Sequence, residues 1–299
     1  MGIKYGNLNV DEKYSRILEP NLYFDSILVP GVTYTDKYQT GPAGGIYVHK
    51  LDTTAVTVGT PGRDFTDEAS SDTLIPILLN NNYMKSKKIY GVQAAAVSFD
   101  LANEQLATAT QEIKESRQQS ALGCLVQEGT TSTVKTAITT GAVDAVLDEA
   151  AKIKKGKANV VLCSPDFYAL VLKENGKDFT PAKNDEVAAT GAIGDLYGFT
   201  WIRAAGLGEA EAKYYDSTGA LKTVTLHKEA TTSVDGSAVD FILYNNETLS
   251  IVDNLESYRI VDSENFTGSK AQAELNTGMK VTTPALARVR THKIAKTGA

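Results

Sequence analysis

The stretch from Ser98 to Gly129 constrains the fold more than any other part of the sequence. Its small and apolar residues recur every three or four positions, which is the pattern of a helix with one buried face: Phe99, Ala102, Leu106, Ala109, Ile113 and Ser116. Asp100 can cap the first N–H groups, Gln118 is expected on the polar face, and Gly129 can end the helix in the left-handed conformation. At ~1.5 Å per residue, the helix would be roughly 40 Å long. This length favours a structural strut, although an ordinary core helix of an α/β domain would show the same pattern.

Composition narrows the class of protein. The chain has 299 residues and a formal net charge of −6, so it can bury a sizeable core and does not have the basic excess of a general nucleic-acid binder. Cys124 and Cys163 lie in apolar surroundings and are expected to be buried thiols rather than a disulfide. The first residues lack the pattern of a secretory signal, and no apolar run approaches ~18 residues, so we expect no membrane partner.

Residues 1–40 are expected to form an extended arm. Pro20 and Pro30 interrupt any helix there. The arm is rich in aromatic residues, among them Tyr14, Tyr23, Phe24, Tyr34 and Tyr38. Because an arm has no core of its own, these rings must find apolar surface on the same subunit or on a neighbour.

Residues 41–97 are expected to form β structure around a polar tip. Alternating apolar residues predict strands near Ile46–Val48 and Val56–Val58, and the return is expected over Leu74–Leu79 and Lys87–Val97. The tip, Gly59–Asp72, contains turn-forming and charged residues. Such a hairpin has too few apolar residues for a core and needs a partner surface. The segment therefore points to assembly.

Residues 130–254 are expected to form a compact α/β unit in which helices cover a sheet. Ser164 and Pro165 form a typical helix start, and Asn175-Gly176 a typical helix end. The expected elements are a helix over 142–155, a strand over Asn159–Cys163, a helix over 165–175, and strands over Phe199–Arg203, Leu221–His227 and Val239–Tyr244.

The last segment, 255–299, is expected to end in a strand from Leu286 onward. Its alternation places Arg288, Arg290 and His292 on one face. We expect these side chains to be solvated or salt-bridged rather than part of a nucleic-acid site.

The sequence offers no constellation for catalysis. His49, His227 and His292 are isolated and lie outside metal-ligand spacing, and zinc, nucleophile-elbow and P-loop motifs are missing. The glycines near 191–198 and 206–208 suit turns rather than a dinucleotide fingerprint. We therefore predict no catalytic, cofactor-binding or metal residues and no enzyme, with a cytoplasmic α/β enzyme as the alternative from a different class.

The order of these parts resembles the major capsid proteins of tailed bacteriophages, which have the Hong Kong 97-type fold. Three stretches strengthen the resemblance: a strand running into a long helix (Gly91–Gly129), a glycine-punctuated turn and strand (Gly191–Leu207), and closing strands with a Pro-Ala pair (Glu264–Arg290). The resemblance covers nearly the whole chain and lies mainly in the order of the parts.

The resemblance implies an α+β fold with named parts. These are an N-arm (1–40), an E-loop hairpin (41–88), a P domain with the spine helix (89–138), an A domain (139–254) and returning P-domain strands (255–299). The helix residues are Leu106, Ile113 and Leu122. The implied assembly interfaces are the aromatic residues of the arm and the hairpin tip, with Gly59, Pro61, Gly62, Arg63, Asp64 and Phe65.

The resemblance also implies partners. The chain would assemble with itself into hexamers and pentamers of an icosahedral shell around double-stranded DNA, with a separate scaffolding protein, a portal and non-specific contact with the DNA. It would be made in the cytoplasm of a bacterial host and end in the virion, without a cofactor. Some relatives cross-link a hairpin lysine, but nothing pairs Lys85, Lys87 or Lys88 with an acceptor, and we do not predict that bond. An encapsulin-type nanocompartment shell shares the fold, and a tail tube or sheath subunit is a further alternative.

Overall fold

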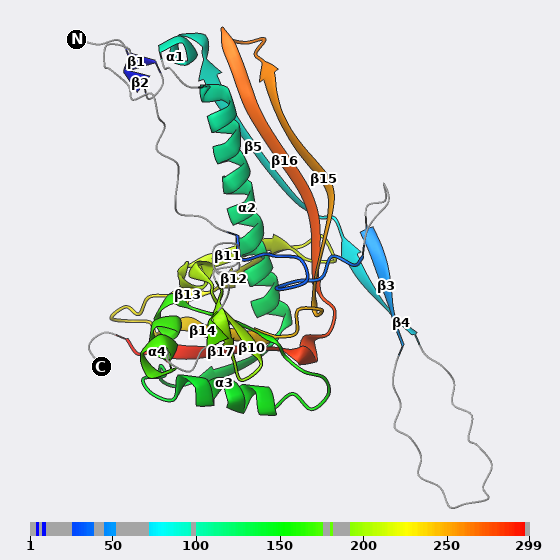
Figure 1. Cartoon of the computed structure of the whole chain (residues 1–299), viewed down its shortest axis with the longest axis vertical. Helices are drawn as coiled ribbons and strands as arrows, with labels where there is room; N and C mark the ends of the chain where they lie inside the picture. Colours follow the sequence, from blue (N-terminus) through cyan, green and yellow to red (C-terminus); the bar gives the residue numbers. More distant parts are fainter. Residues whose placement is uncertain are drawn as a thin grey trace, which may run out of the picture.

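The computed structural model describes residues 26–38, 45–51, 72–96, 100–175 and 192–296. It also places three two-residue strands, β1 (Lys4–Tyr5), β2 (Leu8–Asn9) and β8 (Thr180–Pro181). The described part is a mixed α+β structure. Figure 1 shows a long helix beside long strands, a compact sheet with two helices around the lower end of that helix, and a projecting hairpin.

The long helix, α2 (Leu101–Glu128), was expected from the sequence. The Asp100 carboxylate accepts the N–H groups of Ala102 and Asn103, at 3.1 and 3.2 Å, as an N-cap does. Gly129 ends the helix, but the expected left-handed conformation is wrong, because its φ and ψ are −73° and 168°. A Cβ at this position would lie 2.6 Å from the Leu125 carbonyl oxygen. Glycine is therefore needed here for close packing as the chain runs straight into β6 (Thr130–Val134).

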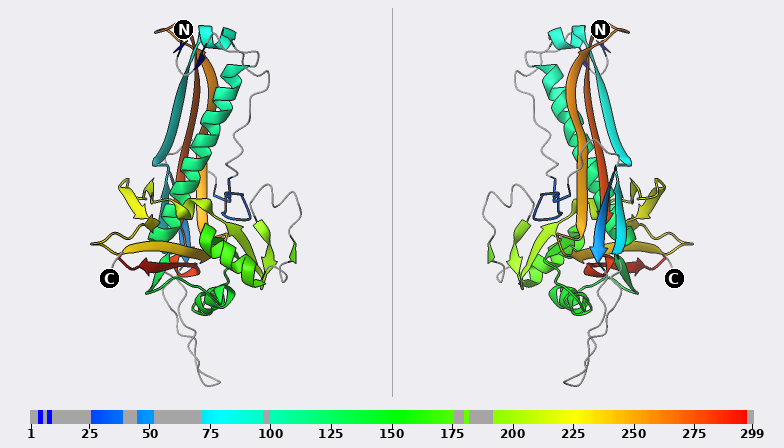
Figure 2. Two further views of the ribbon diagram at one scale, coloured as in Figure 1. Left: turned by 90° about the vertical axis from the view of Figure 1, so that its left-hand side faces the viewer. Right: turned by 90° about the vertical axis from the view of Figure 1, so that its right-hand side faces the viewer.

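Three antiparallel strands run along the first half of α2 and form what we call the long sheet (Figure 2). Their order is β15 (Leu249–Asp262), β16 (Gly268–Val281) and β5 (Asn81–Tyr90). Small and apolar residues of β16 alternate toward the helix and pack there with Ala109 and Ile113. The buried β16 residues beside the first half of the helix are Ala271, Ala273 and Leu275.

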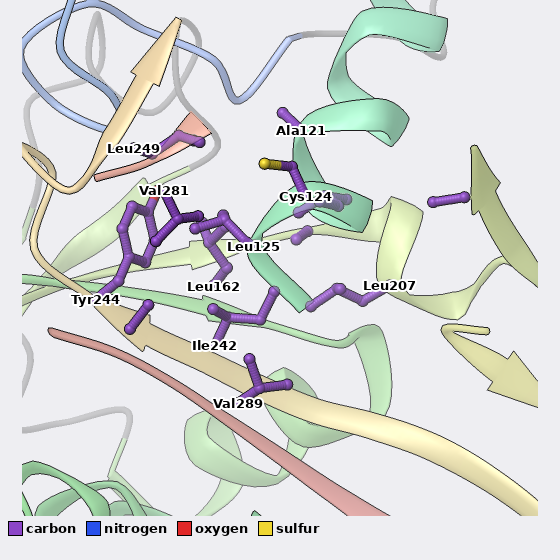
Figure 3. Close-up of a cluster of buried hydrophobic side chains, with 14 of the residues drawn as sticks. Ala121, Cys124, Leu125, Leu162, Leu207, Ile242, Tyr244, Leu249, Val281 and Val289 are labelled. Atoms are coloured by element: carbon purple, nitrogen blue, oxygen red, sulfur yellow. The ribbon is translucent and has the colours of Figure 1, made fainter. Parts of the chain in front are cut away.

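The part of α2 from residue 117 to residue 126 is buried or half-buried on all sides, which the single expected stripe did not predict. Gln118 is only 4% exposed, whereas Ser116 is exposed. The large core around Ala121, Cys124 and Leu125 joins the helix to the compact sheet, as Figure 3 shows. Gln118 was expected on the solvated face; it is buried because it binds the chain's own N-terminal segment there.

The compact sheet has eight strands, and seven of them follow the order β6-β17-β14-β7-β10-β9-β8. Their remaining bounds are β7 (Val160–Cys163), β9 (Ala192–Leu196), β10 (Phe199–Arg203), β14 (Gly236–Tyr244) and β17 (Ala287–Ile294), and β13 (His227–Lys228) pairs with β14. One face packs on α2, and the other on α3 (Ala142–Ala151) and α4 (Pro165–Asn175). β7, α4 and β10 agree closely with the predicted elements.

Three predicted elements differ from the structure in length, type or position. α3 stops at Ala151 instead of 155, because the N–H groups of Lys152 and Ile153 bond to carbonyls three residues back and tighten the last turn. The segment after Tyr90 is a short helix, α1 (Gly91–Ala96), and not strand. β17 lies in the compact sheet between β6 and β14, whereas β15 and β16 run beside α2.

The smaller elements complete the chain. The hairpin of β3 (Gly45–Leu51) and β4 (Asp72–Leu78) projects from the body. A second hairpin, β11 (Glu211–Tyr215) and β12 (Leu221–Thr225), packs against α2. Two short 3-10 helices, η1 (Ala205–Gly208) and η2 (Pro284–Leu286), follow β10 and precede β17.

Candidate assembly surfaces

The β3–β4 hairpin has one apolar face without a partner in the described part of the chain. The register pairs Tyr47 with Pro76, His49 with Leu74 and Leu51 with Asp72, so these side chains share that face. Tyr47, Leu51 and Leu74 are 60%, 69% and 53% exposed. The opposite face contacts the body, where Ile77 is 1% exposed and Lys50 Nζ donates to Thr283 Oγ1 at 3.3 Å. An exposed apolar face of this kind marks an interaction surface.

The predicted hairpin-tip residues lie outside the described residues. Gly59, Pro61, Gly62, Arg63, Asp64 and Phe65 therefore stay predictions from the sequence. One of the strands that lead to the tip, β3, lies where the alternation at Ile46 and Val48 predicted a strand.

The N-terminal segment 26–38, which we call the strap, is fixed on its own chain. The Ile27 N–H donates to Gln118 Oε1 at 2.8 Å, and the Tyr244 hydroxyl donates to the Thr33 carbonyl at 2.7 Å. The Thr35 N–H bonds to the Leu249 carbonyl at 2.9 Å, which adds the strap to the start of β15. These bonds make the strap part of the fold.

Some of the predicted aromatic residues of the arm lie outside the described residues, and others lie within them. Tyr14, Tyr23 and Phe24 lie outside the described residues. Tyr34 is 5% exposed inside the large core, with the Arg117 guanidinium 5.5 Å from its ring centroid, and burial raises its pKa. We therefore assign Tyr34 to the core of its own chain and not to a subunit contact, since its ring is already covered. Tyr38 is half-buried beside Lys37.

The three predicted helix residues all face the interior. Leu106 packs against the small cluster of Ile89, Leu101 and Ala271, and Ile113 is 3% exposed beneath the long sheet. Leu122 belongs to the large core that joins α2 to the compact sheet. Their role is therefore to hold the long helix between two sheets.

Ion pairs around α2 were not predicted from the sequence. Lys85 and Lys87 on β5 both reach Glu112, at 2.9 and 2.7 Å. Burial alone would raise the Glu112 pKa, but hydrogen bonds from both lysines lower it overall. Glu128 accepts from Lys280 Nζ at 2.8 Å and from the Val281 N–H at 2.9 Å. A signal existed for Glu128, because an acidic residue in the last turn opposes the helix dipole and implies a basic partner.

Two of the three basic residues on the predicted face of β17, Arg288 and His292, are salt-bridged, as expected. Arg288 pairs with Glu149 of α3 at 3.1 Å, and His292 with Asp240 of β14 at 2.8 Å. Asp240 lines a cavity of about 420 Å³. Burial raises its pKa, while His292 and Arg290 act in the opposite direction. The described residues contain no group of three side chains placed to hold a metal ion.

The helices in the described part of the chain fall short of the length and apolar character that a membrane span requires.

Comparisons with known proteins find similarity in structure and not in sequence. No protein-family model matches the sequence, and no curated protein matches it. A chain from Mycobacterium phage Che8 has a TM-score of 0.64 at 17% identity, covering 96% of this chain and 98% of that one. The capsid of cyanophage P-SCSP1u gives 0.64 at 12% identity, with coverages of 96% and 93%. The capsid of Helicobacter pylori bacteriophage KHP30 gives 0.66 at 11% identity, with coverages of 98% and 100%. The chain has a phage capsid fold. At these identities the similarity establishes the fold.

Proposed function

We propose that the chain is a major capsid protein that assembles with itself into an icosahedral shell around double-stranded DNA. One observation carries the proposal: each similar phage capsid chain matches nearly all of this chain, and the match covers nearly all of the capsid chain as well. The unpartnered apolar face of the β3–β4 hairpin supports it. Tyr47, Leu51 and Leu74 are 53–69% exposed, and exposed apolar surface of this kind marks a site of contact with another protein.

The division of the chain into parts belongs to the same proposal. Residues 1–40 would be the N-arm, 41–88 the E-loop, 89–138 the P domain with the spine helix, 139–254 the A domain and 255–299 the return. Because 26–38 is bound to its own chain, we propose that contacts between copies use the part of the arm that contains Tyr14, Tyr23 and Phe24. The hairpin tip would lie across a neighbour, and interfaces of this permanent kind bury more than ~2,000 Å².

The proposed partners follow from the shell. Copies would form hexamers and pentamers, a separate scaffolding protein and a portal would direct closure, and DNA would be touched without sequence preference. The subunit would be made in the host cytoplasm and function in the virion as a structural protein rather than an enzyme.

Electron microscopy of the purified chain beside size-exclusion chromatography tests the proposal. We expect closed particles or sheets of rings. If the chain alone does not form them, they should form after addition of salt or a crowding agent, or on co-expression with the scaffolding protein. Nucleic acid inside native particles distinguishes a phage shell from a nanocompartment that packages an enzyme. A chain that stays monomeric under all these conditions, with small-molecule turnover, would contradict the proposal.

A further inference from the structure

The link between the projecting hairpin and the long sheet is only two residues long. β4 ends at Leu78 and β5 begins at Asn81. Within the link, the Asn80 N–H bonds back to the Leu78 carbonyl at 3.0 Å. On this side of the hairpin, any change in its angle to the body must occur in these residues.

Asn81 clamps this link to the β11–β12 hairpin. Its side chain donates to the Tyr215 carbonyl at 3.1 Å and accepts the Tyr215 N–H at 2.8 Å. One amide thus satisfies both backbone groups of one residue, as a neighbouring strand would. Asn80 adds a bond from its side chain to the Asp216 carbonyl at 3.0 Å. Asn81 is 3% exposed, so water competes little for its side chain.

The surface that receives the clamp is itself held in place. Asp216 Oδ1 accepts from the Thr218 hydroxyl and from the N–H groups of Thr218 and Ala220. These bonds hold the pKa of the Asp216 carboxyl well below its usual range, and the bond from the Thr218 hydroxyl has the largest effect. On the adjoining strand, the Ser120 hydroxyl of α2 donates to the Lys213 carbonyl at 2.7 Å. The clamp therefore connects the hairpin to the long helix through fixed contacts.

Gly278 of β16 confines the link from another side. A Cβ at Gly278 would lie 2.7 Å from the Leu78 carbonyl oxygen and 3.3 Å from Ile77 Cγ2. The end of β4 thus lies in close backbone contact with β16, while Asn81 holds the start of β5. The hairpin has little room to change its angle as long as both contacts persist.

We propose that Asn81 is a positioning residue that fixes the angle of the β3–β4 hairpin and thereby sets the geometry of contacts between copies. The inference rests on the proposed function, because the angle matters for assembly only if the hairpin contacts a neighbour. A fixed angle repeats the same contact in every copy, and a variable angle gives contacts of many curvatures.

Distance measurements on the isolated chain test the clamp without reference to assembly. Spin labels at Leu51→Cys on the hairpin and Lys114→Cys on α2 occupy exposed positions, and the native Cys124 and Cys163 are buried. We expect a narrow distance distribution that Asn81→Ala broadens or shifts. Asn82→Ala is the matched control, because Asn82 is exposed and, within the described residues, its side chain bonds only to Glu274, at 3.2 Å.

Two further variants keep the test decisive. Asn81→Asp has the same size but sets a carboxylate oxygen against the Tyr215 carbonyl, so it should broaden the distribution as well. If either Asn81 variant fails to fold, Asn80→Ala removes only the bond to Asp216. An unchanged distribution in the folded Asn81 variants would overturn the clamp.

Particle imaging tests the second half of the proposal. Asn81→Ala should give particles of mixed size and shape where the parent chain and Asn82→Ala give uniform ones. Uniform particles from a variant whose label distances have broadened would overturn the link between hairpin angle and assembly. If the parent chain forms no particles at all, the proposed function fails, while the label distances still decide the clamp.

Discussion

Glu149 on α3 shows how a buried charge stabilises the compact sheet. Its side chain is 1% exposed and pairs with Lys152, which directly follows the helix, and with Arg288 of β17 at 3.1 Å. Burial acts to raise the Glu149 pKa, but hydrogen bonds from Lys152 and Arg288 lower it overall. A carboxylate held in this way stabilises the folded state only while it is ionised.

Glu149→Gln should therefore give a pH-dependent loss of stability. Because the pKa in the folded state lies below the ordinary value of 4.5, the stabilisation is fully present above about pH 4.5 and is lost as the pH falls through the folded pKa. Breaking a buried pair costs about 3 kcal/mol, so urea unfolding at pH 7 should show a loss of that order, and the difference between variant and parent should shrink in acid.

The control for this experiment is Glu211→Gln. Glu211 pairs with Lys213 at 3.3 Å but is 49% exposed, and exposed pairs contribute about 0–1 kcal/mol. A Glu149→Gln loss that is as small as the control, or independent of pH, would show that the buried pair does not stabilise the sheet.

Gly129→Ala should destabilise the chain by about 1–3 kcal/mol, as overpacking does. The added methyl group would lie 2.6 Å from the Leu125 carbonyl oxygen and 3.1 Å from Val289 Cγ2. Gly208→Ala is the control, because its Cβ would meet Pro165 at an ordinary 3.7 Å. Thermal unfolding measures both variants, and equal melting temperatures would contradict the close packing at Gly129.

At the scale of elements, the sequence predicted most of the helices and strands that depend only on neighbouring residues. The Ser164-Pro165 start and the Asn175 end of α4, and the apolar run of β7, depend only on neighbouring residues. The pairing of β5 with β16, the helix at Gly91–Ala96 and the burial of Gln118 depend on segments distant in sequence. The sequence predicted that the hairpin needs a partner surface, because a segment with few apolar residues cannot form a core. The register of its strands could not be predicted.

The strap should be released by Gln118→Ala. The buried Ile27 N–H would lose its partner, which costs about 1–3 kcal/mol. Hydrogen exchange over residues 26–38 should accelerate while exchange in the compact sheet stays slow. Gln111→Ala on the same helix, where the side chain is only half-buried, is the control; equal exchange in the two variants would rule out Gln118 as the anchor.

At the scale of the whole molecule, folding and assembly should be separable. Replacing Gly59–Asp72 by a short Gly-Ser turn removes no residue from the described cores. We expect a chain with unchanged circular dichroism and a melting temperature within a few degrees of the parent, but no particles by electron microscopy. Normal particle yield from this variant would mean that the tip is dispensable.

The second half of α2 contributes side chains to one continuous core with the compact sheet, while its first half carries the long sheet. Neither half of the molecule can lose this helix and keep its own interior. The long sheet and the compact sheet are therefore joined through α2 into a single thermodynamic unit. Calorimetry should show one transition whose van't Hoff and calorimetric enthalpies agree, so that the two sheets are either both folded or both unfolded in any one molecule.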